Sequence, residues 1–356
     1  MTSISEEQRV AASINAPSAE ANALDRWLLE ATVCPVDHCE LKLDGNYLVS
    51  TKNPRRRYPV VHGIPVFLRD DDESTAWWAR VSLERAKRFA ETGRDTEFYD
   101  PGVESVHPHV QGIIESTGGH LYDALRGKLT EYPIPTIRVA DRGAQDALLL
   151  DSGCNWGRWT FSAARKGVPA IGVDPSLAAV IAARQIRRQL NLPCSFFVGD
   201  CRFLPFKPGT FSDVFSYSVV QHFSKPNAAM AVAEFGRVLR EGGECLVQMP
   251  NALGIRSLYH LGRRGFSAGK EFDVRYYLPG ELKRLMGGGF SDVHLLLDAF
   301  LGLGIQPDDR AYMPWKNRLV IDVSEVLRWL QGVFPPLINL ADSLYLHGKK
   351  ASRNNV

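Results

Sequence analysis

The feature that most constrains the fold of this chain is a regular alternation of short apolar segments with helix-like segments from residue 147 onward. Short continuous apolar segments are typical of strands that are buried on both faces of a parallel sheet. Helices between such strands imply right-handed crossovers, with helices on both faces. We predict a doubly wound α/β core with strands at Ala147–Asp151, Pro169–Val173, Ser195–Val198, Asp213–Ser218 and Glu244–Met249, and helices at Trp159–Lys166, Ser176–Leu190 and Ala228–Leu239.

The rest of the chain divides into segments of different character. A polar, Ala- and Ser-rich start is expected to be flexible, and the segment after it is punctuated by Pro and Gly like a small β-rich unit. An amphipathic helix with Ser74 as its N-cap follows, and a helix from His109 to Arg126 is broken at Gly118-Gly119. The predicted domains are residues 1–23 (flexible), 24–69 (β-rich), 70–140 (helical linker or lid), 141–300 (core, with an insert at 251–278) and 301–356 (C-terminal cap).

Regularity weakens after the fifth strand. Pro279–Met286 is predicted to be a helix and Asp292–Leu297 a strand. The final segment, Asn317–Tyr345, has an amphipathic pattern with two prolines inside it. We therefore expect the end of the chain to cover the core.

Composition limits the classes of function. Apolar residues make up 45% and charged residues 23%, so the chain can bury a sizeable core, and its net charge of +2 gives no overall attraction to nucleic acid or anionic membranes. We find no apolar stretch long enough to span a bilayer and no secretory signal. Six scattered cysteines fit a reducing compartment, so we expect a cytoplasmic protein. The oligomeric state is left open.

The loop after the first strand, Asp151-x-Gly153-x-Asn155-x-Gly157, has the spacing of a ligand-binding turn. Glycine lets the backbone turn sharply and lets a ligand approach the main chain closely. Asn155 stands where a third glycine would be usual, and Asn is the residue after glycine that best tolerates left-handed conformations. Alone, this pattern also fits simple packing of a strand against a helix.

Two further acids follow the next two strands. Asp174 comes after the second strand, where a carboxylate can accept both hydroxyls of a ribose. Asp200 comes after the third strand, where an adenine amine could be held. Since ligands bind at the carboxyl ends of parallel strands, three acids at three successive strand ends indicate a nucleoside-containing ligand.

These residues resemble the motifs of the class I S-adenosylmethionine-dependent methyltransferases, of the small-molecule type related to ubiquinone and menaquinone methylases. The matching segments are 148–157, 172–176, 199–206, 211–218, 221–222 and 237–243. The resemblance implies a Rossmann-like, mainly parallel sheet of seven strands and S-adenosylmethionine as the cofactor. It implies cofactor-binding roles for Asp151, Gly153, Cys154, Asn155, Gly157, Asp174, Pro175, Ser176, Asp200, Cys201, Arg202, Ser218 and Gln221.

A dinucleotide-dependent oxidoreductase is the main alternative for the same loop. Dinucleotide binding needs Gly-x-Gly-x-x-Gly at the start of a helix, so that a pyrophosphate can bind the helix N-terminus. The loop at Gly153–Gly157 lacks that spacing. S-adenosylmethionine has no phosphate, so the methyltransferase interpretation is favoured.

The N-terminal unit carries a second resemblance. Cys34-Pro-Val-Asp-His-Cys39 and Arg57–Leu68 are similar to the small zinc-ribbon-like domain of methyltransferase activator proteins. A tetrahedral zinc site needs two well-spaced ligand pairs, whereas here the first pair is widely spaced and the second is replaced by Ser50-Thr-Lys-Asn53. We predict that this domain has lost its metal ligands and binds no metal.

His222, just after the fourth strand, is the candidate general base for a hydroxyl acceptor, with Gln221 beside it. Asp151 is expected to hold the loop or the cofactor amine rather than act as a base, and His107 and His109 fit a surface position equally well. We predict methyl transfer to a small-molecule acceptor, of natural-product or sugar type, at a hydroxyl, amine or carbon. An RNA methyltransferase that uses the N-terminal domain for RNA recognition, and a non-catalytic cofactor-binding scaffold, are the alternatives.

Overall fold

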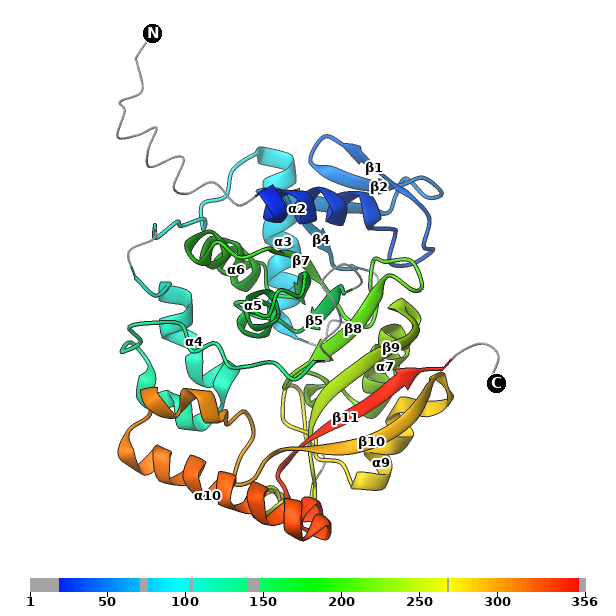
Figure 1. Ribbon diagram of the computed structural model, residues 1–356. Helices are drawn as coiled ribbons and strands as arrows, with labels where there is room; N and C mark the ends of the chain where they lie inside the picture. The colour runs from blue at the N-terminus through cyan, green and yellow to red at the C-terminus, as the bar shows by residue number, and fades with distance from the viewer. Residues whose placement is uncertain (1–18, 71–75, 103–104, 140–146, 268, 352–356) are drawn as a thin grey trace.

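The computed structural model describes residues 19–70, 76–102, 105–139, 147–267 and 269–351. It is built around one sheet with the strand order β1-β2-β3-β4-β7-β6-β5-β8-β9-β11-β10, and helices lie on both sides of the central strands (Figure 1). The predicted α/β class is therefore confirmed. The predicted number of seven strands is wrong, because the sheet has eleven.

The five strands predicted from the sequence form the middle of the sheet. They are β5 (Leu149–Ser152), β6 (Ala170–Asp174), β7 (Cys194–Gly199), β8 (Phe211–Ser216) and β9 (Leu239–Pro250). All neighbouring pairs among them are parallel, with β6 and β8 on either side of β5. The chain order reverses at β5, and such a switch point opens a crevice at the carboxyl ends of the strands. The crossover helices are α5 (Arg158–Arg165), α6 (Leu177–Leu190) and α7 (Lys225–Val238).

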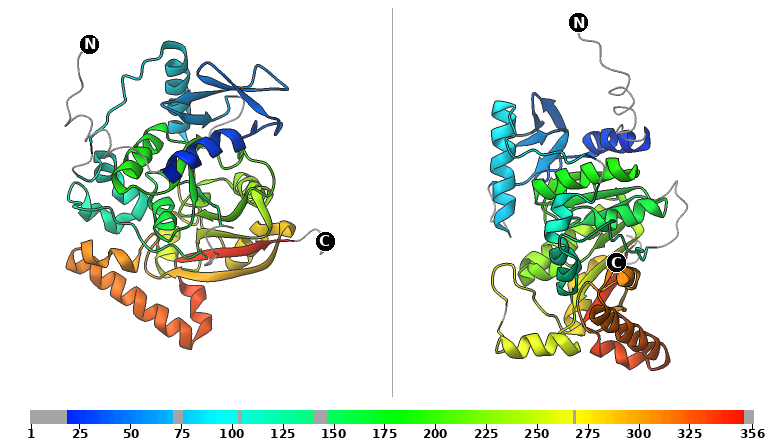
Figure 2. Two further views of the ribbon diagram at one scale, coloured as in Figure 1. Left: turned by 45° about the horizontal axis from the view of Figure 1, so that its top comes forward. Right: turned by 90° about the vertical axis from the view of Figure 1, so that its left-hand side faces the viewer.

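The C-terminal segment is part of the core sheet rather than a cap added after residue 300. Strand β10 (Phe290–Ala299) is followed by α10 (Trp315–Val333) and then β11 (Ser343–Lys350), which inserts between β9 and β10 and is antiparallel to both. The sequence prediction took the apolar start of β11 as the end of an amphipathic segment. The sequence of a short apolar segment next to a helix does not show whether the segment forms a strand or continues the helix. The strands with which it pairs decide this, and they lie far away in sequence. Figure 2 shows α10 packed along one end of the molecule.

The N-terminal unit extends the same sheet. Strands β1 (Leu41–Asp44), β2 (Tyr47–Ser50), β3 (Arg57–Val61) and β4 (Ile64–Phe67) form an antiparallel meander, and β4 then pairs in parallel with β7. Residues 24–31, predicted to be strand-like, are instead part of helix α2 (Ala19–Ala31). Trp27 of this helix stacks on Phe206 at 6.1 Å between ring centroids, so its apolar face packs against the core.

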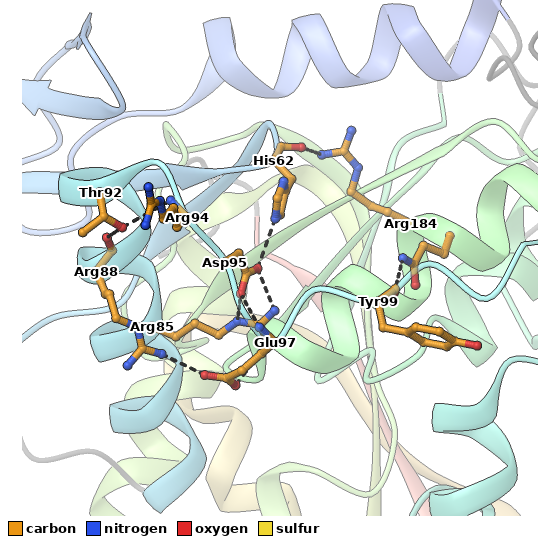
Figure 3. A network of polar contacts seen from close by, with 10 residues as sticks. His62, Arg85, Arg88, Thr92, Arg94, Asp95, Glu97, Tyr99 and Arg184 are labelled. Carbon is orange, nitrogen blue, oxygen red and sulfur yellow. Dashed lines mark hydrogen bonds and ion pairs between the residues drawn. The ribbon is translucent and has the colours of Figure 1, made fainter.

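A partly buried polar network joins the β3–β4 turn to α3 (Trp77–Thr92) and α6, as Figure 3 shows. Arg85 donates from Nε and Nη2 to the two carboxylate oxygens of Asp95, at 2.9 and 2.7 Å. His62 Nε2 lies 3.0 Å from Asp95 Oδ2, and Arg184 donates to the His62 carbonyl at 2.9 Å. These contacts fix α3 beside the carboxyl ends of the strands. The predicted N-cap Ser74 lies outside the described residues.

The predicted break in the next helical stretch is present. Helix α4 (Pro108–Gly118) has Gly119 as its C-cap residue, and a 3₁₀ helix, η1 (His120–Leu125), follows. Gly119 has φ +95°, and a Cβ there would lie 2.5 Å from the carbonyl oxygen of Leu303, so this close approach requires glycine. Within the described ranges, no helix has the length and apolar character needed to cross a membrane.

Candidate functional site

The loop after β5 turns back tightly toward the neighbouring strand β6. The backbone amides of Gly153 and Cys154 both donate to the carbonyl oxygen of Val173, at 2.8 and 2.9 Å. Gly153 has φ +80° and Asn155 has φ +46°, so the left-handed backbone expected of Asn155 is present. A Cβ at Gly153 would lie 2.1 Å from Val219, which follows β8. The glycine is therefore needed for conformation and for space.

The three predicted acids lie at the carboxyl ends of β5, β6 and β7 but differ in environment. Asp174 accepts hydrogen bonds from the amides of Asn155 and Ser176, at 3.0 and 2.9 Å, which fixes its carboxylate, and burial raises its pKa to about 6. Asp151 is 1% exposed and accepts from the Thr160 hydroxyl at 2.6 Å. Burial raises the pKa of Asp151 to about 7. Asp200 is only partly buried and is paired with Arg202 at 2.7 Å.

These loops enclose a cavity of about 610 Å³, the larger cavity of the site, whose roof is formed by α3 and α4. Its volume is in the range of small-molecule and cofactor pockets. Ten of the predicted residues line it: Gly153, Cys154, Asn155, Asp174, Pro175, Ser176, Asp200, Cys201, Ser218 and His222.

The other four predicted residues do not line the larger cavity. Asp151 lies behind the loop against Thr160, and Gly157 lies where a Cβ would meet Phe161 and Phe196 at 2.9 Å. The Arg202 guanidinium is directed to Asp200, and Gln221 lines a second cavity. The cofactor-binding role of these four residues stays a prediction.

The larger cavity contains polar side chains that the sequence did not identify. His109 of α4 and Arg158 of α5 both line it. His109 Nε2, Asn155 Oδ1 and Arg158 Nη1 are buried and have no hydrogen-bond partner among the described residues. The His109 and Asn155 side chains interact with each other but not with good hydrogen-bond geometry. Buried polar atoms without well-formed hydrogen bonds are costly in a folded protein, so these atoms around one cavity indicate a polar ligand.

A surface position, one of the two alternatives for His107 and His109, does not hold for His107, which is buried, and His109 is partly buried. His107 is 6% exposed, and its Nε2 lies 2.7 Å from Gln185 Oε1. Burial, followed by the charge of His107, lowers the pKa of His109 to about 4, so the imidazole of His109 is neutral near pH 7. No local pattern connects His109 to a loop more than forty residues later, which is why only the structure identifies it.

Arg158 is fixed by a buried ion pair with the C-terminal segment. Its guanidinium contacts the carboxylate of Asp309 and the hydroxyl of Tyr122, and its Nε donates to the Pro133 carbonyl at 3.0 Å. The side chains of Arg158 and Asp309 are 2% and 1% exposed. Arg158 directly follows the loop motif in the sequence, but its partner Asp309 lies 151 residues further along the chain. The sequence therefore could not predict this ion pair.

His222 lies where the larger cavity meets a smaller one of about 300 Å³. The two cavities share Ser116, Ser218 and His222. The imidazole stacks on Phe272 at 3.9 Å between centroids, and its Nδ1 lies 2.7 Å from the Phe272 carbonyl oxygen. Burial lowers the pKa of His222, so its neutral form is favoured near pH 7.

The cysteines of the N-terminal unit contact hydroxyl groups. Cys34 Sγ lies 3.3 Å from the Tyr58 hydroxyl, and Cys39 Sγ lies 3.1 Å from Ser50 Oγ. Among the described residues, no group of three or more His, Cys, Asp or Glu side chains is arranged to hold a metal ion.

The central part of the chain matches a known domain family. Residues 149–243, from β5 into β9, match the family model described as "Methyltransferase domain". The chain carries a methyltransferase domain. S-adenosylmethionine is the cofactor of this domain.

Curated relatives of this chain fall into two groups. "Probable tRNA methyltransferase 9B" of Mus musculus is 29% identical over 151 residues, which are 42% of this chain and 31% of that protein. The chain thus spans about a third of the length of that relative. A UPF0434 protein of Ruegeria pomeroyi is 44% identical over 50 residues, which are 14% of this chain and 81% of that protein. Over that short stretch the chain belongs to the UPF0434 family.

Two solved structures illustrate the similarity of the fold. Phosphoethanolamine N-methyltransferase 2 of Haemonchus contortus, in complex with S-adenosyl-L-methionine, has 15% identity and a TM-score of 0.43, and the match covers 81% of this chain and 62% of that one. A SAM-dependent methyltransferase of Methanosarcina mazei has 14% identity and a TM-score of 0.42, with 58% and 93% covered.

Proposed function

We propose that the larger cavity binds S-adenosylmethionine and that the methyl group is transferred to a small-molecule acceptor in the smaller cavity. The observation that carries this proposal is the meeting of the two cavities at Ser218 and His222, beside the loop after β5. A methyltransferase must bring donor and acceptor into line, and two adjoining cavities suit such an arrangement.

The residues of the larger cavity fit the cofactor. The fixed carboxylate of Asp174 would accept the ribose hydroxyls, and Asp200 and Cys201 would hold the adenine. Asn155 Oδ1, which interacts with the His109 side chain, makes no hydrogen bond of good geometry among the described residues, and Arg158 Nη1 lacks an acceptor there. These two atoms suit the amine and the carboxylate of the methionine part. Gly153 keeps the backbone open to that part of the ligand.

S-adenosylmethionine supplies a methyl group that is already activated on a sulfonium, so the protein contributes orientation and proton handling. Val219 packs against Gly153, which brings the end of β8 next to the loop that would hold the methionine part. His222, three residues further on, is the candidate base for a hydroxyl acceptor. Its lowered pKa favours the neutral imidazole that proton acceptance requires.

Calorimetric titration with S-adenosylmethionine and S-adenosylhomocysteine tests the donor half of the proposal. Replacing Asp174 with Ala should weaken binding of both ligands about 100-fold, because hydrogen bonds to a charged group each contribute about 1.5–3 kcal/mol. Asp44→Ala is the matched control, since Asp44 is exposed in β1. Absence of binding by the wild type would contradict the proposal, and unchanged binding by Asp174→Ala would remove the ribose assignment.

A second candidate function is methylation of RNA. It is supported by the names of the Mus musculus and Homo sapiens relatives, which are 29% identical to parts of this chain. The net charge of +2 is unfavourable for it, because phosphate contacts need clustered Lys and Arg. Retention on an RNA column that weakens steeply with salt would support this function, and absent or salt-insensitive retention would exclude it.

A further inference from the structure

The smaller cavity is lined by cations from one helix and by loops that are far apart in the sequence. Helix α8 (Ile255–Arg263) contributes Arg256 and His260, which are four residues apart and therefore on one face. Arg264 follows directly and also lines the cavity. The opposite wall comes from the end of α4, the start of η1 and residues 302–305.

Arg256 is the least neutralised cation of this cavity. Its Nη1 donates to the Leu301 carbonyl at 2.9 Å, and among the described residues no carboxylate lies within ion-pair distance of it. Arg264 is only loosely paired, with Asp273 at 3.6 Å. Burial, followed by the charges of Arg256, His120, Arg264 and Arg263, lowers the pKa of His260. Arg256 and Arg264 therefore place two cationic side chains together with His260 at this end of the cavity.

The two acids of the cavity are already engaged. Asp342 accepts hydrogen bonds from the amides of Ser257 and Leu301, at 2.8 and 2.7 Å. Glu115 is ion-paired with Arg126 at 2.6 Å, although its Oε2 is buried without a hydrogen-bond partner among the described residues. Within the described ranges, neither acid forms an ion pair with the guanidinium of Arg256.

Gln221 gives the cavity a second recognition group, next to His222. The residue is 2% exposed, and its Nε2 donates to Ser218 Oγ at 2.8 Å. Its Oε1 is buried without a hydrogen-bond partner among the described residues. A buried acceptor oxygen without a partner is stabilised when a ligand donates an N–H or O–H hydrogen bond to it.

We propose that the smaller cavity recognises an acceptor molecule with a phosphate or carboxylate group at Arg256 and His260, and with a hydroxyl or amine at Gln221. Guanidinium groups bind such anions through charge-assisted hydrogen bonds. The hydroxyl or amine would then lie beside Ser218 and His222, where the two cavities meet. This inference rests on the proposed function, because it assigns the acceptor class of the same site.

The test is a ³¹P NMR titration of the full-length protein, saturated with S-adenosylhomocysteine, with inorganic phosphate. A parallel titration with acetate, followed by calorimetry, distinguishes phosphate from carboxylate recognition. Arg256→Gln should weaken binding of the preferred anion about tenfold, which corresponds to the loss of about 1.4 kcal/mol. Arg263→Gln is the matched control, since Arg263 is exposed on the same helix, contacts Tyr259 and does not line the cavity.

Two outcomes would overturn this inference. One is that the wild type binds S-adenosylhomocysteine but neither anion, which leaves the proposed function intact. The other is that Arg256→Gln and Arg263→Gln weaken anion binding equally, which indicates diffuse attraction to the basic surface, as an RNA-binding protein would show. Calorimetry with S-adenosylhomocysteine on each variant shows whether the fold and the larger cavity are preserved.

Discussion

The two cavities that meet at His222 are built in different ways. The larger one is formed mainly by loops between residues 153 and 201, where hydrogen bonds from main-chain amides fix Asp174 and glycine keeps space open. The smaller one is formed by side chains from α4, α8 and residues 302–305, and two arginines are among them. A donor shared by a whole family can be held by backbone geometry. An acceptor that differs between enzymes is recognised by side chains on segments outside the core.

The largest expected effect concerns Arg158, which joins the larger cavity to the C-terminal segment. Arg158→Gln leaves Asp309 buried without its charged partner, so the free energy of unfolding should fall by about 3–5 kcal/mol. Arg310→Gln, in the same short helix as Asp309, breaks an exposed ion pair with Asp322 and should cost less than about 1 kcal/mol. Urea denaturation of both variants measures the difference. Equal losses would show that the larger cavity does not depend on this contact.

Gly153 tests whether the loop of the larger cavity needs both conformation and space. Gly153 and Gly167 have nearly the same φ, +80° and +78°, but only Gly153 is crowded, since a Cβ at Gly167 meets nothing within 4 Å. Both alanine variants should lose about 1–2 kcal/mol to left-handed strain, and Gly153→Ala should lose about 1–3 kcal/mol more through overpacking against Val219. Urea denaturation and calorimetry with S-adenosylhomocysteine check this. Similar stability and ligand affinity in the two variants would contradict it.

The pH dependence of ligand binding should distinguish the contribution of the Asp174 carboxylate from that of the other residues of the larger cavity. Burial raises the pKa of Asp174 to about 6, so its carboxylate is mostly ionised at pH 7 and mostly protonated at pH 5. Affinity for S-adenosylhomocysteine should therefore fall by up to about tenfold as the pH drops from 7 to 5, because each pH unit below the pKa removes about 90% of the ionised form. His109, with a pKa of about 4, stays mostly neutral over this range.

Asp174→Asn is the control for this pH profile, since an amide does not titrate. Its affinity should be weaker and nearly constant between pH 5 and 7. Asp151, whose pKa burial raises to about 7, does not line the larger cavity, so its titration should change this affinity little. A wild-type profile with no change through pH 6 would show that the Asp174 carboxylate is not the ribose acceptor.

The sequence by itself determined the α/β core, the five central strands and the positions of Asp174 and Asp200 at strand ends. This was possible because parallel strands joined by helices have their carboxyl ends at the same edge of the sheet. Residues at the ends of consecutive strands therefore lie close together. It also anticipated the left-handed backbone of Asn155, since that conformation depends on residue type and immediate neighbours.

Only the tertiary structure decided which residues complete the two cavities. No sequence pattern indicated that His109 would face the loop after β5, that Asp309 would pair with Arg158, or that β11 would insert beside β9. Such contacts join segments separated by tens to hundreds of residues, and their geometry depends on how the whole sheet and its covering helices pack. The carboxyl ends of the strands were therefore predictable, whereas the roof of the larger cavity and the walls of the smaller one were not.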